Sequence, residues 1–397
     1  MSEPRRIFLG AFGDPGHAFP MLALGERLAA RGHIVTMETW ARWRERVEAA
    51  GLRFVPAPEY PVFPTRERPL KPYEAVLAAT PETRREVADA APHVVVHDIL
   101  TIAPALAAEL EGLPVATLVP HVLPVTEPGF PPYAVGGRLP RRRTSEALWR
   151  ALSGPLRRGL ELGRAELNET RARLGLPRLE RLHGGLSAEL CIVGTFPQLE
   201  YPRPWPAAVH VVGPLLWEPP AHDVGLPPGS DPLVVVATST AQDPEHRMLR
   251  ATLAGLAGEP VRVLGTWNRR LPSAPIRVPA NARLVEWMSY ARTMPKAALV
   301  VCHAGHGTLV RALASGCPVL AVPHLGDMNE NAARVDWAGA GVRVPWRFVS
   351  PATLRWAARR ALADRSLTAR AAELAAWARD HDGASRAAEL IEAFAGR

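Results

Sequence analysis

The sequence predicts an α/β protein built from two doubly wound, Rossmann-like halves that face each other across a cleft. Short apolar strand-like runs alternate with amphipathic helical segments along the chain, which is typical of parallel sheets covered by helices. The length of 397 residues also exceeds one ordinary domain and fits two halves of roughly 200 residues each. Ligands of such sheets bind beyond the carboxyl ends of the strands, so a site between the halves is expected.

The first half is expected over residues 1–212. Two stretches within it, 56–72 and 120–140, are rich in proline and aromatic residues and show no periodicity, so they are expected to be long loops over the cleft. Their aromatic side chains favour contact with a small apolar molecule, the acceptor-binding candidates being Phe63, Phe130 and Tyr133. Strands are expected at 6–12, 33–38, 94–97, 114–119 and 189–193, and helices at 19–31, 103–110 and 148–174.

A linker and a second half follow. Residues 213–231 are rich in proline and glycine and are expected to join the halves. The alternation of strands and helices then resumes over 232–374. A last helix, at about 375–397, is expected to pack back on the first half.

Charge and composition exclude several function classes. The net charge of +8 comes almost entirely from arginines that are scattered among acids, which argues against a nucleic-acid partner. The triplet 141–143 is the exception, and it indicates a solvated loop or a weak peripheral association with an anionic surface. No apolar run reaches the roughly 18 residues that a membrane-spanning helix needs. Cys191, Cys302 and Cys317 fit no disulfide framework, so a cytoplasmic location is expected.

A glycine-rich turn in the second half has the form of an anion site. A buried apolar strand leads into residues 302–308, CHAGHGT, and a helix is predicted to start at about Thr308. Gly305 and Gly307 allow close backbone approach, while the amides and dipole at a helix start attract negative charge. His303, at the strand tip, can donate a further hydrogen bond.

The segment around this turn resembles the donor-binding signature of the family 1 glycosyltransferases. The resemblance runs through VVCHAGHGTLVRALASGCPVLAVPHLGDMNENAARVDWAGAGVRV, and a weaker similarity extends over the chain. That family adopts the GT-B fold and uses UDP- or TDP-sugars, and its members include macrolide and other antibiotic-tailoring enzymes. The resemblance therefore implies a nucleotide-sugar donor and a small natural-product acceptor.

The resemblance implies roles for the matching positions on the donor side. His303 would bind the diphosphate together with the amides around 305–308, and Thr240 would touch the phosphates. Trp287 falls where the family packs or hydrogen-bonds the base, and its neighbour Met288 is a further donor-binding candidate.

The sugar end departs from the family pattern. Asp327 and Met328 stand where the family has Asp-Gln, and a thioether cannot replace the amide donor that binds sugar hydroxyls. A deoxysugar is therefore favoured over glucose, unless Met328 points elsewhere and Asp327 alone holds the sugar. Glu330 and Asn331 fall where the family anchors the loop or the ribose.

A second constellation lies near the N-terminus. His17 follows the first strand in the turn 13–20, GDPGHAFP, and an imidazole with a pKa near 6.5 can take a hydroxyl proton. The family's Gly-His-x-x-Pro element has this form, and the resemblance makes His17 the general base with Asp98 as its carboxylate partner. Asp14 is a second candidate partner, whereas His97 should point to the opposite face of its strand.

The expected reaction is a single inverting displacement that needs no metal, because the helix start can stabilise the leaving diphosphate. Three alternatives stay open at this point. Gly10, Gly13, Gly16 and Glu38 have a pattern close to a dinucleotide-binding oxidoreductase, although the spacing is wrong. The GT-B fold also hosts nucleotide-sugar epimerases and hydrolases, and inactive auxiliary partners exist. The sequence does not distinguish a monomer from a homodimer.

Overall fold

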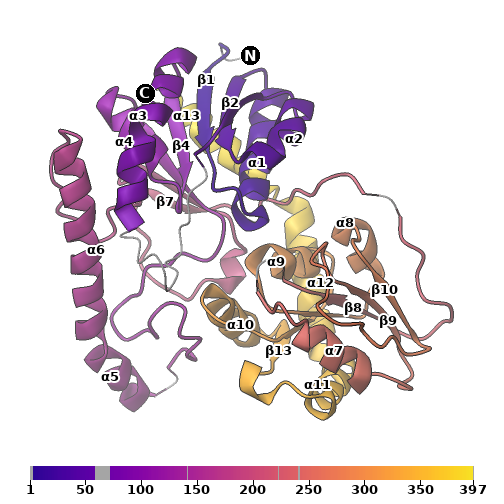
Figure 1. Cartoon of the computed structure of the whole chain (residues 1–397). Coiled ribbons are helices and arrows are strands. Elements are labelled where there is room, and N and C mark those ends of the chain that lie inside the picture. Colours follow the sequence, from indigo (N-terminus) through magenta and orange to yellow (C-terminus); the bar gives the residue numbers. More distant parts are fainter. Residues whose placement is uncertain (1–2, 59–71, 141, 222, 240–241, 397) are drawn as a thin grey trace.

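The computed structural model describes residues 3–396, apart from 59–71, 141, 222 and 240–241. The chain forms two parallel sheets, one in each half (Figure 1). The α/β prediction is confirmed, and so is the doubly wound arrangement, because helices cover both faces of each sheet. No helix within the described ranges is long and apolar enough to cross a membrane.

The first sheet has seven strands in the order β3-β2-β1-β4-β5-β6-β7. All neighbouring pairs are parallel, so the carboxyl ends of the strands share one edge of the sheet. The strands are β1 (Arg6–Gly10), β2 (Ile34–Thr39), β3 (Arg53–Pro56), β4 (Val94–Asp98), β5 (Val115–Val119), β6 (Leu190–Val193) and β7 (Val209–Val211).

Helices of the first half cover both faces of this sheet. α1 packs on one face with the C-terminal helix α13, while α3 and α4 pack on the other. α5 and α6 form a long rod along the far side of the half (Figure 1). The helices are α1 (Pro15–Ala30), α2 (Arg44–Ala49), α3 (Pro72–Ala90), α4 (Ala103–Leu110), α5 (Arg143–Ala151) and α6 (Ser153–Arg173), with short 3₁₀ turns η1 (Ala41–Trp43) and η2 (Pro197–Leu199).

The second sheet has six strands in the order β10-β9-β8-β11-β12-β13. α9 and α12 cover one face, and α7 and α11 cover the other. Its strands are β8 (Leu233–Ala237), β9 (Arg262–Thr266), β10 (Ala282–Val285), β11 (Leu299–Cys302), β12 (Val319–Ala321) and β13 (Gly341–Arg343). Its helices are α7 (Arg247–Gly255), α8 (Tyr290–Thr293), η3 (Met294–Lys296), α9 (His306–Ala314), α10 (Asp327–Trp337), η4 (Trp346–Phe348), α11 (Pro351–Ala363) and α12 (Arg365–Asp380).

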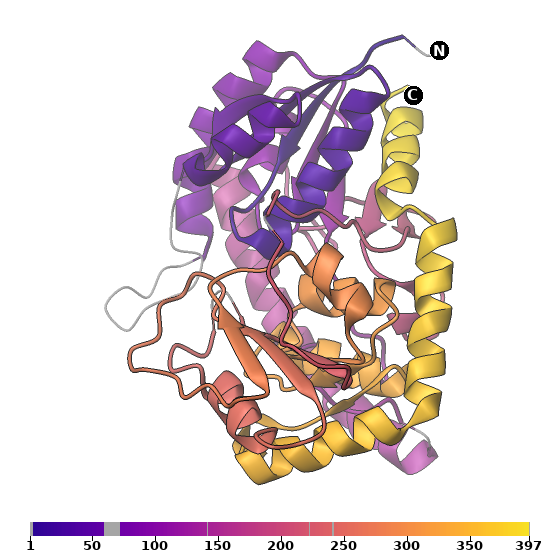
Figure 2. The same ribbon diagram turned by 90° about the vertical axis from the view of Figure 1, so that its right-hand side faces the viewer.

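The C-terminal segment returns to the first half, but not as one helix over 375–397. α12 ends at Asp380, and α13 (Gly383–Ala395) starts after a short break. The carboxylate of Asp382 caps α13 by accepting hydrogen bonds from two backbone amides, which explains the break. α12 packs on α9, whereas α13 packs on α1 (Figure 2).

The chain crosses between the halves at two places that touch each other. The first crossing starts at Gly213, and the second follows α12 and ends at Gly383, the first residue of α13. A Cβ added to Gly383 would lie 2.5 Å from the carbonyl oxygen of Gly213, so the two backbones are in direct contact. Only glycine fits at position 383 without moving the first crossing.

A buried cation joins the halves at another point. Arg334 of α10 is 3% exposed, and its Nε donates to Glu330 at 2.7 Å. Its Nη1 donates across the interface to the carboxylate of Glu200 and to the carbonyl of Leu199, both at 3.2 Å. The guanidinium also lies 3.5 Å from the ring centroid of Tyr201. Both halves therefore depend on one buried charge network.

Candidate active site where the two halves meet

The structure brings His17 and Asp98 together. Asp98 ends β4 and is fully buried, while His17 lies in the first turn of α1 with its side chain 16% exposed. Their Nδ1 and Oδ1 atoms are 2.7 Å apart. The carboxylate also accepts hydrogen bonds from the amides of Phe12 and Leu100, which fix its orientation. Because an ionised carboxylate can only accept, Nδ1 of His17 carries the proton and Nε2 keeps a free lone pair.

The start of α9 has the geometry expected of an anion site. α9 begins at His306, two residues before the predicted start, with Gly305 at its N-cap and Ala304 in the left-handed region at φ 62°. The first amides of a helix have no partner within it, and here no side chain caps them. A Cβ added to Gly305 or Gly307 would meet no described atom within 4 Å, so the glycines border open space. This space is where an anion would approach the amides.

His303 is placed differently from the expectation. Its ring is 2% exposed; Nδ1 accepts the backbone N–H of Ser239 at 3.1 Å, and Nε2 lies 3.0 Å from the Asp243 carboxylate. Nδ1 therefore carries the lone pair, and Nε2–H donates to Asp243. Both ring nitrogens are used within the protein, so the direct hydrogen bond to a diphosphate is not available in this arrangement. The ring instead ties the segment after β8 to the strand tip below the α9 turn.

Two further histidines that the sequence analysis missed lie where the halves meet. His121 follows β5, and its ring centroid is 6.1 Å from that of His17. His306, the first residue of α9, lies 6.5 Å from His121 by the same measure. Tyr133 stacks on His121 with a centroid distance of 6.2 Å, so this acceptor candidate does reach the site. The position of His121 beyond the carboxyl end of a strand is the signal that could have identified it.

Comparisons with known proteins identify the family. Residues 252–390 match the family described as erythromycin biosynthesis protein CIII-like, C-terminal domain. The chain is also 30% identical to O-mycaminosyltylonolide 6-deoxyallosyltransferase of Streptomyces fradiae, over 98% of this chain and 97% of that protein. The chain is a family 1 glycosyltransferase of the natural-product type.

Other relatives agree with this assignment. The glycosyltransferase is 27% identical to 4'-demethylrebeccamycin synthase of Lentzea aerocolonigenes, over 98% of this chain and 99% of that protein. The solved structure of the glycotransferase of kitacinnamycin superposes with a TM-score of 0.77 at 22% identity, covering 99% of this chain and 100% of the other. The GT-B fold is therefore confirmed.

The remaining donor candidates Trp287 and Met288 are neighbours in the sequence but have different surroundings. Trp287 stacks on Tyr290 at 6.4 Å between ring centroids, with the guanidinium of Arg269 at 4.8 Å from its ring, so an aromatic surface does exist there. Met288 is 1% exposed in the core of the second half, so its side chain cannot contact a base, contrary to expectation. Thr240 and the acceptor candidate Phe63 lie outside the described residues.

The sugar-side candidates lie on the first turns of α10. Asn331 is 1% exposed and donates to the carbonyl of Ala304 at 3.0 Å and to Asp327 at 3.3 Å, so it joins α10 to the α9 turn. Asp327 is half-buried, and Met328 is 9% exposed. Glu330 does not face a ligand, because it is buried in an ion pair with Arg334.

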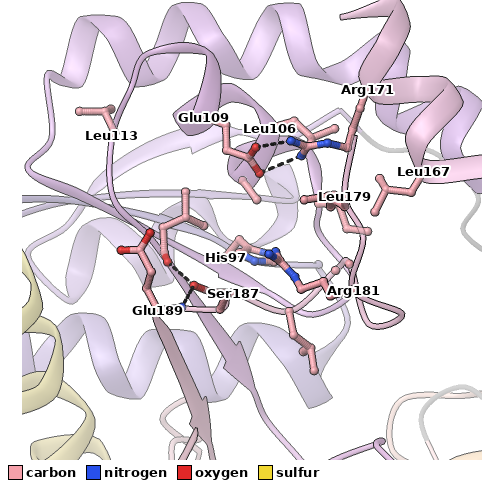
Figure 3. Close-up of a pocket in the computed structure, with 17 residues that line it drawn as sticks. His97, Leu106, Glu109, Leu113, Leu167, Arg171, Leu179, Arg181, Ser187 and Glu189 are labelled. Carbon is pink, nitrogen blue, oxygen red and sulfur yellow. Dashed lines mark hydrogen bonds and ion pairs between the residues drawn. The ribbon is translucent and has the colours of Figure 1, made fainter. Parts of the chain in front are cut away.

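Phe130 and His97 do not reach the site, whereas Asp14 acts on His17 through its charge alone and raises the pKa of the imidazole. Phe130 packs at right angles on Tyr201, with 5.7 Å between ring centroids, so a direct acceptor contact is not supported. Asp14 lies 3.4 Å from Arg42 rather than on His17. His97 points to the opposite face of β4, as expected, and accepts from the Thr117 hydroxyl at 2.7 Å. It lines a separate pocket of about 240 Å³ near the Arg171–Glu109 ion pair (Figure 3).

The geometry also rules out the oxidoreductase alternative. Cβ atoms on Gly10 and Gly13 would lie 2.4 Å from Pro104 and 2.0 Å from Trp40, so these glycines serve internal packing and leave no space for a pyrophosphate. Glu38 is 2% exposed and accepts a hydrogen bond from Thr83, and burial raises the pKa of its carboxyl to about 8. It does not present a carboxylate to a ribose.

Electrostatics favour proton transfer at His17. Burial lowers the pKa of the imidazole, but the Asp98 carboxylate outweighs it, and Asp327 from the second half acts in the same direction, so the pKa ends above 6.5. Burial raises the pKa of Asp98, but His17 and the backbone amides outweigh that effect and keep the carboxyl ionised. Asp327 belongs to the second half, so the charge environment of His17 includes a carboxylate from across the interface.

Replacing Asp98 by Asn should change the pH profile of transfer in a defined direction. Only neutral His17 can accept a proton, so the activity of the native enzyme should fall as the pH drops through the raised pKa of His17, above 6.5. Without the carboxylate, burial dominates and the pKa falls, so the acidic limb of the kcat–pH profile should move to lower pH while the plateau decreases. An unmoved limb contradicts the dyad, and circular dichroism at each pH provides the control.

Replacing Gly307 by Ala should separate stability from donor binding. The new Cβ meets no described atom and lies in a helix, so the substitution should stabilise the fold by about 0.4–1 kcal/mol. In the donor site, however, the methyl should weaken TDP binding by about 1–3 kcal/mol through overpacking. The matched control is Gly159→Ala in α6, which is equally open but remote. Equal TDP affinity of both variants by calorimetry contradicts the phosphate site at α9.

Proposed function

We propose that the glycosyltransferase moves a sugar from a UDP- or TDP-sugar to a hydroxyl of a small natural-product acceptor, with inversion at the anomeric carbon. The observation that carries this proposal is the lone pair on Nε2 of the neutral His17 ring, which Asp98 orients through Nδ1, in a side chain that is still 16% exposed. The relative named O-mycaminosyltylonolide 6-deoxyallosyltransferase, whose name specifies the transfer of a deoxysugar, supports the substrate classes.

The mechanism follows from the positions of these groups. His17 Nε2 takes the proton of the acceptor hydroxyl as its oxygen attacks the anomeric carbon. The bond between that carbon and the diphosphate oxygen breaks at the same time, and the electron pair leaves with the nucleoside diphosphate. Asp98 stabilises the imidazolium that forms, and the amides at the start of α9 stabilise the negative charge on the leaving oxygen. One displacement inverts the configuration.

His303 has a different part in this proposal from the one the family pattern implies. Its hydrogen bonds to Ser239 and Asp243 fix the segment after β8 against the strand tip. Asp243 also accepts the amides of Arg247 and Met248 at the start of α7, so one carboxylate organises both elements. We assign His303 and Asp243 to positioning the phosphate loop, and the α9 amides to contacting the phosphates.

The donor sugar is proposed to be a deoxysugar. Met328 stands where the family has a glutamine, and its thioether offers no hydrogen-bond donor to a sugar hydroxyl. It is 9% exposed on the first turn of α10, where Asp327 and Asn329 are the partly exposed polar side chains. A sugar that lacks one hydroxyl fits such a surface without leaving a polar group unpaired.

Product analysis tests the function. The enzyme is incubated with TDP-glucose, TDP-6-deoxyglucose and UDP-glucose, each with and without a panel of phenolic and macrolide acceptors, and the products are identified by mass spectrometry and NMR. We expect transfer that depends on the acceptor and gives the β-linked product from an α-linked donor. Free sugar formed without acceptor indicates a hydrolase, a changed nucleotide sugar indicates an epimerase, and nucleotide binding without turnover indicates an auxiliary protein. Each of these outcomes overturns the proposal.

A further inference from the structure

His121 has the same hydrogen-bonding state as the base His17. Its Nδ1 lies 2.8 Å from the carbonyl oxygen of Val122, and a carbonyl can only accept, so Nδ1 carries the proton. Nε2 of His121 consequently bears a lone pair. Throughout the part of the chain that the structure describes, no hydrogen bond to this Nε2 is found.

The surroundings keep His121 neutral. Burial lowers the pKa of its imidazole, and His17 lowers it further whenever His17 is protonated. The hydrogen bond to Val122 and the carboxylates of Asp327 and Asp98 act in the opposite direction with smaller effects. Tyr133 stacks on the ring at an interplanar angle of 28°, and its hydroxyl lies 3.4 Å from Nδ1, so a residue of the stretch 120–140 supports the ring. A neutral ring with a fixed tautomer is a hydrogen-bond acceptor of defined direction.

His17 and His121 thus form a pair. Both rings are anchored through Nδ1 to oxygen atoms of the first half, and both keep Nε2 unprotonated. Their centroids are 6.1 Å apart with the ring planes at 82° to each other. A centroid separation of 6.1 Å matches the span of two hydrogen bonds of about 2.8 Å each to two neighbouring hydroxyls.

We propose that His121 is a specificity-determining residue that accepts a hydrogen bond from a second hydroxyl of the acceptor, next to the one that reacts at His17. The preferred acceptors are therefore vicinal diols, including catechols, rather than isolated alcohols or phenols. The inference rests on the proposed role of His17 as the base. Because His121 and Tyr133 belong to the half that holds His17, the second hydroxyl belongs to the acceptor and not to the donor sugar.

The test compares matched acceptors in the presence of TDP. Calorimetry measures the affinity of the intact protein for 2,3-dihydroxynaphthalene and for 2-naphthol, in the native form and in His121→Phe, which keeps a stacking ring without nitrogen. The native protein should prefer the diol by about tenfold, as expected for one well-formed hydrogen bond, and the ratio should fall to about one in the variant. His121→Gln, which restores an acceptor oxygen, should recover part of the preference. His381→Phe is the control, because this exposed ring stacks on Trp377 and does not belong to the His17–His121 pair, so its loss should leave the ratio unchanged.

The outcomes separate this inference from the proposed function. Three outcomes overturn the role of His121, even when transfer is observed. They are equal affinity of the native protein for both naphthols, no binding of either, and a preference that survives in His121→Phe. If His121→Phe changes only the KM of the nucleotide sugar in a transfer assay, His121 contacts the donor, and the proposal is overturned as well. Failure of the proposed function appears instead as an absence of transfer to any acceptor. The diol preference is measured by binding without turnover, so the two failures can be distinguished.

Discussion

Replacing His17 by Ala should lower kcat for sugar transfer by about 10²–10⁴-fold, the usual contribution of a general base. The imidazole is the only group in the described site that combines a free lone pair with a carboxylate-oriented ring on the acceptor side. Without it, water or the weakly basic acceptor oxygen must handle the proton in the transition state. Binding of TDP should stay unchanged, because the α9 amides lie in the other half.

Single-turnover kinetics at saturating donor measure this effect, since they isolate the chemical step from product release. The double variant His17→Ala/Asp98→Asn gives an internal control. Because Asp98 acts through His17, the second substitution should add little to the first. A double variant that is slower by the product of the two single effects indicates that Asp98 has a separate function, and near-native kcat in His17→Ala removes His17 from the mechanism.

Replacing Arg334 by Ala should destabilise the fold by about 3–5 kcal/mol, because the substitution leaves buried carboxylates without their cation. Glu330 and Glu200 are each at most 5% exposed, and both are bonded to the guanidinium. Burial raises the pKa of Glu330, and Arg334 partly offsets this, so the pKa should rise further in the variant. A carboxyl group whose pKa is higher in the folded than in the unfolded state lowers the free energy of unfolding as the pH rises through its folded pKa. The loss of stability in Arg334→Ala should therefore be larger at pH 8 than at pH 5.

Urea denaturation at the two pH values measures this loss. Arg386→Ala is the matched control, because Arg386 forms an exposed i,i+3 pair with Glu389 and should contribute little. Arg334→Met tests the charge separately from the volume of the side chain and should also destabilise the protein. If Arg334→Ala and Arg386→Ala have the same effect at both pH values, the buried network does not hold the halves together.

Sequence reasoning found those site residues that depend on a single strand or turn. Asp98 and His17 each lie just beyond a short buried strand, and the shared edge of a parallel sheet brings such positions together. The turn before α9 could be identified from its glycines for the same reason. Its helix nevertheless starts at His306 rather than Thr308, because Gly305, and not a hydroxyl side chain, occupies the N-cap.

Features that depend on long-range contacts were not predictable in this way. The orientation of the His303 ring is decided by Ser239 and Asp243, which lie about sixty residues earlier in the chain. The motif alone could not show that both ring nitrogens are already bonded. α3 was missed as well, because it carries Pro81 and follows a proline-rich stretch. The pairing of His121 with His306 requires the two halves to be docked.

The contact between Gly213 and Gly383 has a mechanical consequence. Two covalent connections that run side by side leave two rigid bodies one main freedom, rotation about the point where the connections touch. We expect the start of α9 and His17 to approach or separate when the halves turn about this pivot, and the Arg334 network to resist that turning. Any side chain larger than hydrogen at position 383 would separate the two crossings and alter the rate at which product leaves.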